Sequence, residues 1–196
     1  DELDKKKTVQ LNLYQIQLSD LNQNKTPTAL PINVNEFSTM HPSINAAGTE
    51  LYFASDRPGG FGGMDLYRVN IEDGVFSDPV NLGADINTAG DEVFPFAYSD
   101  QFMFYSSNGK EGAGMMDVYL AENQFENRWK THVLGAGINS VEDDFSFGLN
   151  ENLALGYFAS NRKDGQGADD LYAFDFAPTI HGIQDRYEYT PSDTLV

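Results

Sequence analysis

The residues best suited to chemistry are carboxylates and arginines that recur beside glycine-rich turns. Asp56 and Arg57 precede a Gly-Gly-Phe-Gly-Gly run, and Asp65 follows it. Carboxylate oxygens could hold a calcium ion together with carbonyls of the turn, or they could attract a basic protein. The candidate binding residues of this kind are Glu36, Asp56, Arg57, Asp65, Asp91, Glu92, Asp117, Asp143, Asp144, Asn161, Arg162 and Asp170.

The same residues also have a structural interpretation. An aspartate in a tight turn accepts backbone N–H bonds, and glycine supplies the positive φ that such turns need. Asp65, Asp117 and Asp170 could in addition pair with Arg57 or Arg162 between strands. A single catalytic site needs each residue only once, so recurrence favours a structural role. We therefore expect most of these side chains to hold the fold.

The run from Gly59 to Asp65 is close to the calcium-binding repeat Gly-Gly-x-Gly-x-Asp, but its aspartate comes one position late. That repeat must recur every nine residues to stack into a β-helix, and here it does not. The calcium β-helix is therefore excluded. We expect no cofactor or metal, and an isolated calcium ion at a turn stays open as the alternative.

Signals for catalysis are weak. His41, His132 and His181 lie in different contexts without the spacing of metal ligands. The sequence contains no Gly-x-Ser-x-Gly elbow and no phosphate-binding Gly-Lys-Ser/Thr loop. Paired carboxylates of a glycosidase stay open in so acidic a chain, but no pair stands out. We expect a protein that is not an enzyme.

The candidate residues recur because one block of sequence occurs three times, at a spacing of 52 to 53 residues. Its copies run over 51–67, 102–119 and 155–172. A fixed long period indicates one supersecondary unit that is used repeatedly and buries its apolar faces against its neighbours.

Each unit contains four strand-like segments separated by turn residues. The second segment is apolar on both sides, as in 51–54 and 102–105, which indicates strands covered on both faces. No segment has an apolar stripe of helical period. We therefore predict an all-β fold: a β-propeller of four-stranded antiparallel blades, with about three and a half blades of a longer chain present. The strand order places the linker between units and the glycine-rich loop on one face.

The repeat also sets the predicted domain boundaries. Tyr14 lies 53 residues before Tyr67, so we expect the chain to open with the second half of a blade. The predicted divisions are an N-terminal tail 1–10, propeller units 11–36, 37–89, 90–141 and 142–176, and a segment 177–196 that is a linker or the start of a following β-sandwich domain.

Composition limits the partners. Of 196 residues, 40% are hydrophobic and 13% aromatic, which is enough for a folded core. The net charge of −18, from 30 acidic and 12 basic residues, disfavours nucleic acid and anionic membrane surfaces. We expect no membrane span, because no apolar run approaches 18 residues. The acidity serves either solubility or a face for a basic protein or a cation.

The sequence from Leu51 to Tyr67, followed by Phe76, Pro-Val-Asn-Leu-Gly and Ile-Asn, resembles the TolB-type WD40-like propeller repeat. More narrowly, it is similar to the version in Bacteroidota envelope proteins that carry an OmpA-type domain, and in domain layout to the peptidoglycan-anchoring component of the type IX secretion apparatus. The resemblance covers residues 11–176 and is strongest in the first complete copy.

This resemblance implies a periplasmic scaffold, associated with the outer membrane, whose propeller docks other envelope proteins. Peptidoglycan would be bound only through a domain outside this chain. The alternative is a propeller that is accessory to a hydrolase, either a peptidase or a glycosidase.

Overall fold

The computed structural model describes residues 10–20, 25–125, 128–150 and 155–175. The fold is all-β with antiparallel sheets, as the sequence predicted for the class. Within the described ranges the helical structure is limited to one 3-10 turn, η1 (Leu18–Asp20).

The first large sheet, here sheet I, contains β3 (Thr39–Ile44), β4 (Glu50–Ser55) and β5 (Asp65–Glu72) in sequence order. Two short strands, β6 (Val75–Phe76) and β7 (Val80–Asn81), both pair with β5. The predicted fourth strand is thus divided in two here, with a proline just before β7 that has no N–H to donate.

Sheet II has four strands in the order β11-β10-β9-β8. They are β8 (Glu92–Ala97), β9 (Phe102–Ser107), β10 (Asp117–Phe125) and β11 (Arg128–Val133). Each strand is antiparallel to its neighbour and follows it in sequence, so the sheet is a simple meander.

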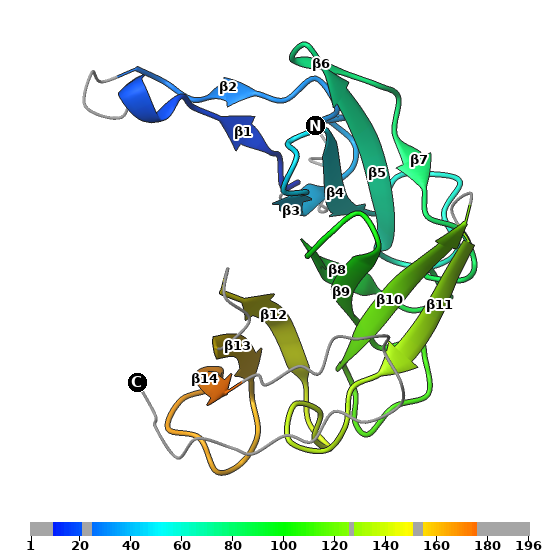
Figure 1. Ribbon diagram of the computed structural model, residues 1–196, viewed down its shortest axis with the longest axis vertical. Helices are drawn as coiled ribbons and strands as arrows, with labels where there is room; N and C mark the ends of the chain where they lie inside the picture. The colour runs from blue at the N-terminus through cyan, green and yellow to red at the C-terminus, as the bar shows by residue number, and fades with distance from the viewer. Residues whose placement is uncertain (1–9, 21–24, 126–127, 151–154, 176–196) are drawn as a thin grey trace, which may run out of the picture.

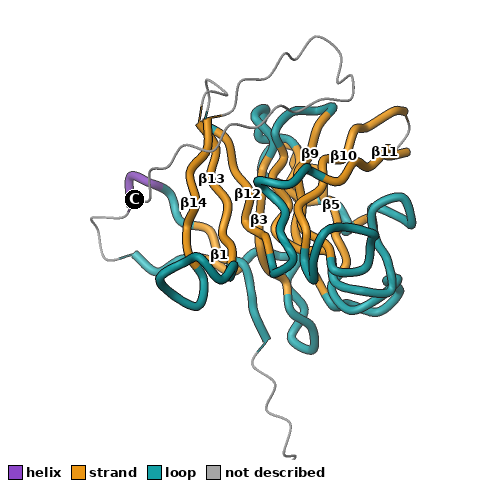
Figure 2. Tube along the Cα trace, turned by 90° about the horizontal axis from the view of Figure 1, so that it is seen from below, coloured by secondary structure: helices purple, strands orange, loops and turns teal. Residues whose placement is uncertain are grey.

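Sheet III comprises β12 (Asp144–Leu149), β13 (Leu155–Ser160) and β14 (Asp170–Asp175). A two-stranded ribbon precedes sheet I and consists of β1 (Tyr14–Gln15) and β2 (Thr28–Ala29). Figure 1 shows the ribbon and the three sheets following one another along an open arc, and Figure 2 shows their strands running side by side with loops at both ends. The segment 177–196, predicted to be a linker or the start of a β-sandwich domain, lies outside the described residues.

The second strand of sheet I is buried on both faces, as its apolar sequence predicted. Leu51 and Phe53 pack against the ribbon, whereas Tyr52 and Ala54 pack towards sheet II. The core is therefore a series of layers between successive sheets, and sheets II and III enclose the next one around Phe104.

The third strands are in equivalent register, because the repeated tyrosines pair with the same position of the second strand. Tyr67 lies opposite Phe53 and Tyr119 lies opposite Tyr105. Tyr172 of sheet III lies opposite its own counterpart, also an aromatic residue. The repeat of the sequence is thus a repeat of strand position.

The first strand of each sheet contains a bulge that the sequence did not predict. The register shifts occur after Met40, Val93 and Phe145. In each bulge a non-glycine residue has positive φ, and these residues are His41 (51°), Phe94 (51°) and Ser146 (54°). An extra residue bends a strand and increases its twist.

Candidate functional site

The candidate residues gather at one end of the sheets, where the loop between the second and third strands meets the linker that leads into the first strand. We call this end the loop face. Ser38 N donates to Asp56 Oδ1 at 2.7 Å, and Asp143 N donates to Asn161 Oδ1 at 2.8 Å. The matching contact of sheet II joins Asp91 N to Asn108 Oδ1 at 2.7 Å. The expected convergence of linker and loop is therefore present in each sheet.

Asp91 also connects two neighbouring sheets. Its carboxylate accepts a hydrogen bond from Met64 N at 2.8 Å, in the glycine-rich loop of sheet I. In the same contact Gly63 N donates to Gly90 O at 2.9 Å. A Cβ at Gly62 would overlap the carbonyl oxygens of Thr88 and Gly90, so glycine is needed here for close approach of two backbones.

The aspartates at the start of the third strands close the glycine-rich loops. Asp65 accepts Phe61 N at 2.7 Å, Gly62 N at 3.2 Å and the side-chain amide of Asn81 at 2.7 Å. Asp170 likewise accepts backbone N–H groups of its own loop, from residues 166 and 167. These carboxylates thus accept hydrogen bonds from the backbone of the loops that they close.

Asp117 of sheet II is less well satisfied. It is 1% exposed and accepts Gly114 N at 3.0 Å, but its Oδ1 has no hydrogen-bond partner among the described residues. One reason is the neighbouring strand, where Val133 occupies the position that Asn81 holds in sheet I. Burial, followed by the negative charge of nearby Asp144, raises the pKa of Asp117 above its ordinary value.

This difference between equivalent aspartates gives a matched test. Asp65→Asn should lower the free energy of unfolding by about 1–3 kcal/mol, because an amide cannot accept all three donors. Asp117→Asn should be neutral or stabilising at pH 7, since it removes a buried charge with an unpaired oxygen. Urea unfolding of both variants measures the difference. Equal losses in the two variants would contradict it.

The pH dependence follows from the same pKa. Because the folded protein holds the Asp117 proton more tightly than the unfolded chain, this group favours folding most at low pH and loses that contribution as pH rises through its raised pKa. Asparagine does not titrate in this range, so Asp117→Asn removes this loss of stability at higher pH. The stability of the variant relative to wild type should therefore increase between about pH 3 and neutrality. A difference that stays constant with pH would contradict this assignment.

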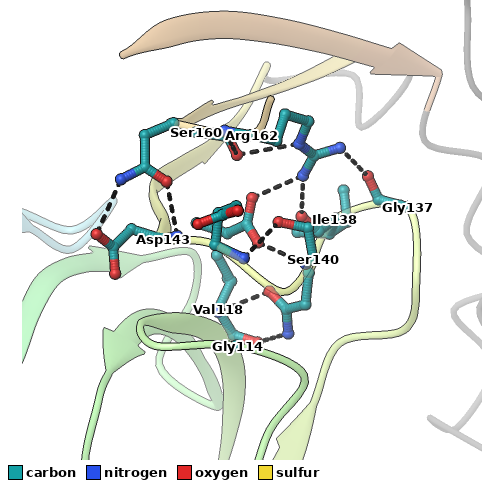
Figure 3. Close-up of polar contacts among 12 residues, drawn as sticks. Gly114, Val118, Gly137, Ile138, Ser140, Asp143, Ser160 and Arg162 are labelled. Atoms are coloured by element: carbon teal, nitrogen blue, oxygen red, sulfur yellow. Dashed lines mark hydrogen bonds and ion pairs between the residues drawn. The ribbon is translucent and has the colours of Figure 1, made fainter. Parts of the chain in front are cut away.

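Arg162 joins the loop of sheet III to the linker before it (Figure 3). Its Nε donates to Ser160 Oγ at 3.0 Å, and its Nη1 and Nη2 donate to Gly137 O at 3.3 Å and Ile138 O at 2.7 Å. Nη2 also pairs with Asp144 Oδ1 at 2.6 Å, and the Asp144 side chain is fully buried. Arg162 thus pairs with the first strand, not with Asp170 of the third strand.

Aromatic rings hold the same guanidinium. The Cζ of Arg162 lies 4.8 Å from the ring centroids of both Phe158 and Tyr172. Such cation–π contacts fix a guanidinium in a partly dry site. The rings belong to the second and third strands, so Arg162 contacts each strand of its sheet and the linker.

Sheet I repeats this arrangement with small changes. Arg57 donates to Ile32 O at 3.1 Å and to Thr39 Oγ1 at 3.3 Å, and its Cζ lies 4.9 and 5.1 Å from the ring centroids of Phe53 and Tyr67. Thr39 takes the place of the buried aspartate of sheet III. Arg57 therefore has a structural role like that of Arg162, but it has no buried carboxylate as a counterion.

Sheet II has no arginine at this position, and Lys110 serves instead. Its Nζ donates to Asp85 O at 3.0 Å, in the linker before the sheet. Burial lowers the pKa of Lys110. Nearby, Glu92 is fully buried and accepts Thr88 N and Oγ1, each at 2.7 Å, and Ser107 Oγ at 2.6 Å. Both side chains connect linker to sheet.

Sequence reasoning missed the most regular polar residue, the asparagine of the repeated Ile-Asn pair. In sheet II, Asn139 Oδ1 accepts Val118 N at 2.8 Å, and its Nδ2 donates to Val118 O and Leu134 O, each at 2.9 Å. The amide thus pairs with the third strand as another strand would. Asn33 and Asn87 make the same pair of bonds with residues 13 and 66. The signal available was the recurrence of Ile-Asn itself.

Two candidate features stay apart from this network. Glu36 is exposed in the turn closed by Phe37 N and Val34 O at 3.2 Å, and no described residue bonds to its side chain. His41 stacks on Phe94 with ring centroids 3.7 Å apart, and burial lowers the pKa of His41 to about 4. Within the described ranges no group of three or more histidine, cysteine, aspartate or glutamate residues could hold a metal ion. His181 lies outside them.

Comparisons with known proteins identify no family. The sequence matches no protein-family model and no curated protein. A solved structure of a puromycin-hydrolysing peptidase from Mycobacterium tuberculosis is similar to 70% of the chain, with a TM-score of 0.47 and 14% sequence identity. The chain spans 20% of that protein, and a likeness of this size supports no conclusion about activity. In the part of the chain that the structure describes, no helix has the length and apolar character of a membrane span.

Proposed function

We propose that the ribbon and the three sheets are consecutive blades of a TolB-type β-propeller. The support is the recurrence of three features in each sheet: the meander order of the strands, a bulge with positive φ in the first strand, and packing of each sheet against the next. Antiparallel sheets stacked face to face around an axis are the architecture of propellers.

For function, we propose a non-enzymatic protein-interaction module of a periplasmic scaffold, associated with the outer membrane and peptidoglycan, of the kind found in type IX secretion. One observation carries the non-enzymatic part. The carboxylates and arginines that could perform chemistry bond to the backbone of their own loops and linkers, as in Asp65 and Arg162. Side chains used in this way in successive sheets build a rigid face, and no nucleophile with an adjacent base is among them.

The same face can recognise a basic protein. The chain has a net charge of −18, and exposed Glu36 and Asp56 add negative charge at the loop face. Complementary charge speeds encounter with a basic partner, and the attraction is screened beyond about 8 Å at physiological salt. The binding of the partner should therefore weaken as salt rises.

A pull-down from envelope extract at low and high salt tests this function. Glu36→Lys is the informative variant, because it reverses an exposed charge that no described residue pairs with. Glu72→Lys is its matched control at the opposite end of the sheets, where the side chain is also exposed. We expect salt-sensitive capture of an envelope protein, weakened by Glu36→Lys and unchanged by Glu72→Lys. No capture at either salt, together with hydrolysis of a peptide or glycan library by the pure protein, would refute the proposal.

A further inference from the structure

A polar pocket lies between sheets I and II at the end opposite the loop face. Its volume is about 480 Å³, and it opens where β4 begins and β5 ends. Asn45 of sheet I reaches Asp100 of sheet II across it, with Nδ2 and Oδ1 3.4 Å apart. Its lining residues are Asn45, Thr49, Glu50, Arg68, Asn70, Ile71, Glu72, Asp100 and Asn123.

A network of partly buried charged groups forms one wall of this pocket. Arg68 Nη1 pairs with Glu50 Oε1 at 2.7 Å, and Tyr52 Oη donates to Glu50 Oε2 at 3.0 Å. The Arg68 and Glu50 side chains are only 18% and 22% exposed. The pair is therefore fixed in place.

The repeat is broken at this pair. The equivalent positions of sheet II hold Phe102 and Leu120, which pack into the apolar layer between sheets II and III. The fold can thus accommodate apolar residues at these two positions. Apolar residues commonly replace partly buried ion pairs without loss of stability. The stability of the fold therefore does not explain why sheet I has a charged pair, Glu50 and Arg68, at these positions. A function that is needed once is expected where one unit departs from the others.

The rest of the lining offers both donors and acceptors. The side chains of Asn70 and Asn123 make no hydrogen bond within the described ranges, and Asp100 has one oxygen without a partner. Asn supplies a carbonyl oxygen and an NH₂ group, Asp only acceptors, and Arg only donors. Hydroxyl groups can satisfy all three, because each is at once a donor and an acceptor.

We propose that this pocket binds a neutral saccharide. The carboxylates of Glu50, Glu72 and Asp100 would repel an anion. The amides of Asn45, Asn70 and Asn123 offer uncharged donors and acceptors that suit the hydroxyl groups of a neutral ligand. Ile71 is the one large aliphatic side chain among the lining residues, and the other eight all carry groups that can form hydrogen bonds. The site is separate from the loop face and independent of the function proposed for it.

The test is titration of the intact chain with a panel of maltotriose, cellotriose and N,N′-diacetylchitobiose, followed by calorimetry and saturation-transfer NMR. We expect at least one to bind with a Kd of about 1 mM or tighter, with little dependence on salt. The double variant Glu50→Phe, Arg68→Leu installs the pair of sheet II and should fold while losing at least about tenfold in affinity. Asn123→Ala is a milder second variant and should weaken binding in the same direction.

Glu36→Lys on the loop face is the control and should leave saccharide affinity unchanged. Conversely, the double variant Glu50→Phe, Arg68→Leu should capture the basic partner as wild type does, which separates failure of this site from failure of the loop face. The proposal is overturned if no member of the panel binds wild type, or if binding persists at full strength in both pocket variants.

Discussion

Replacing Arg162 by methionine should lower the free energy of unfolding by about 3–5 kcal/mol. The side chain pairs with Asp144 at 2.6 Å, and that carboxylate is fully buried. Methionine can fill the space between the Phe158 and Tyr172 rings but supplies no donor. The variant therefore leaves a buried charge without its counterion and removes the donors from two linker carbonyls. Urea unfolding with an unchanged m-value is the measurement.

A second substitution separates the buried charge from the lost packing. Asp144→Asn in the Arg162→Met background removes the charge and keeps an oxygen that can accept Ser140 N, a bond of 2.5 Å in wild type. The double variant should be more stable than Arg162→Met alone, with a coupling of about 1–3 kcal/mol. If the two losses simply add, the ion pair does not stabilise the fold, and Arg162 acts through its stacking and its hydrogen bonds to the linker.

The sequence predicted the strands well because their signal is local. A strand that is apolar on both faces, as in 51–54, must be buried on both sides. The structure accordingly places Phe53 and Ala54 in different core layers. The meeting of linker and loop followed from antiparallel strand order alone. Such inferences need only periodicity and turn residues, both of which can be read from one chain.

The polar network was less predictable because its partners are distant in sequence. Nothing near Asp117 shows that Val133 would leave its Oδ1 unpaired while Asn81 satisfies Asp65. Likewise, Glu50 and Arg68 lie 18 residues apart and become a pair only through the register of β4 and β5. The repeat alignment could have indicated both sites, because each is a position where one unit differs from its neighbours.

The bulges of the first strands were also hidden. Their positive-φ residues are a histidine, a phenylalanine and a serine, which share no turn propensity. Tertiary context fixes this conformation, since His41 stacks on Phe94 of the next sheet. Position in the repeat is thus a better guide to the bulge than residue type.

Asn139→Ala should be the second most damaging substitution, with a loss of about 2–4 kcal/mol. It leaves Val118 N and Leu134 O without partners, whereas Val118 O keeps its hydrogen bond from Leu134 N. Asn139 is 3% exposed, and water cannot easily replace its amide. Its bonds to Val118 and Leu134 attach the linker of sheet II to the third strand. Loss of these bonds should lower the urea midpoint for the whole chain, because successive sheets share core layers.

Asn139→Asp tests whether the bonds or the volume matters. Aspartate has the same shape, but its second oxygen would face the carbonyls of Val118 and Leu134 and repel them, so the loss should equal or exceed that of alanine at pH 7. Asn70→Asp is the matched control, since Asn70 is exposed, and should change stability by less than about 0.5 kcal/mol. A mild effect of Asn139→Asp would show that the amide fills space and does not act as a substitute strand.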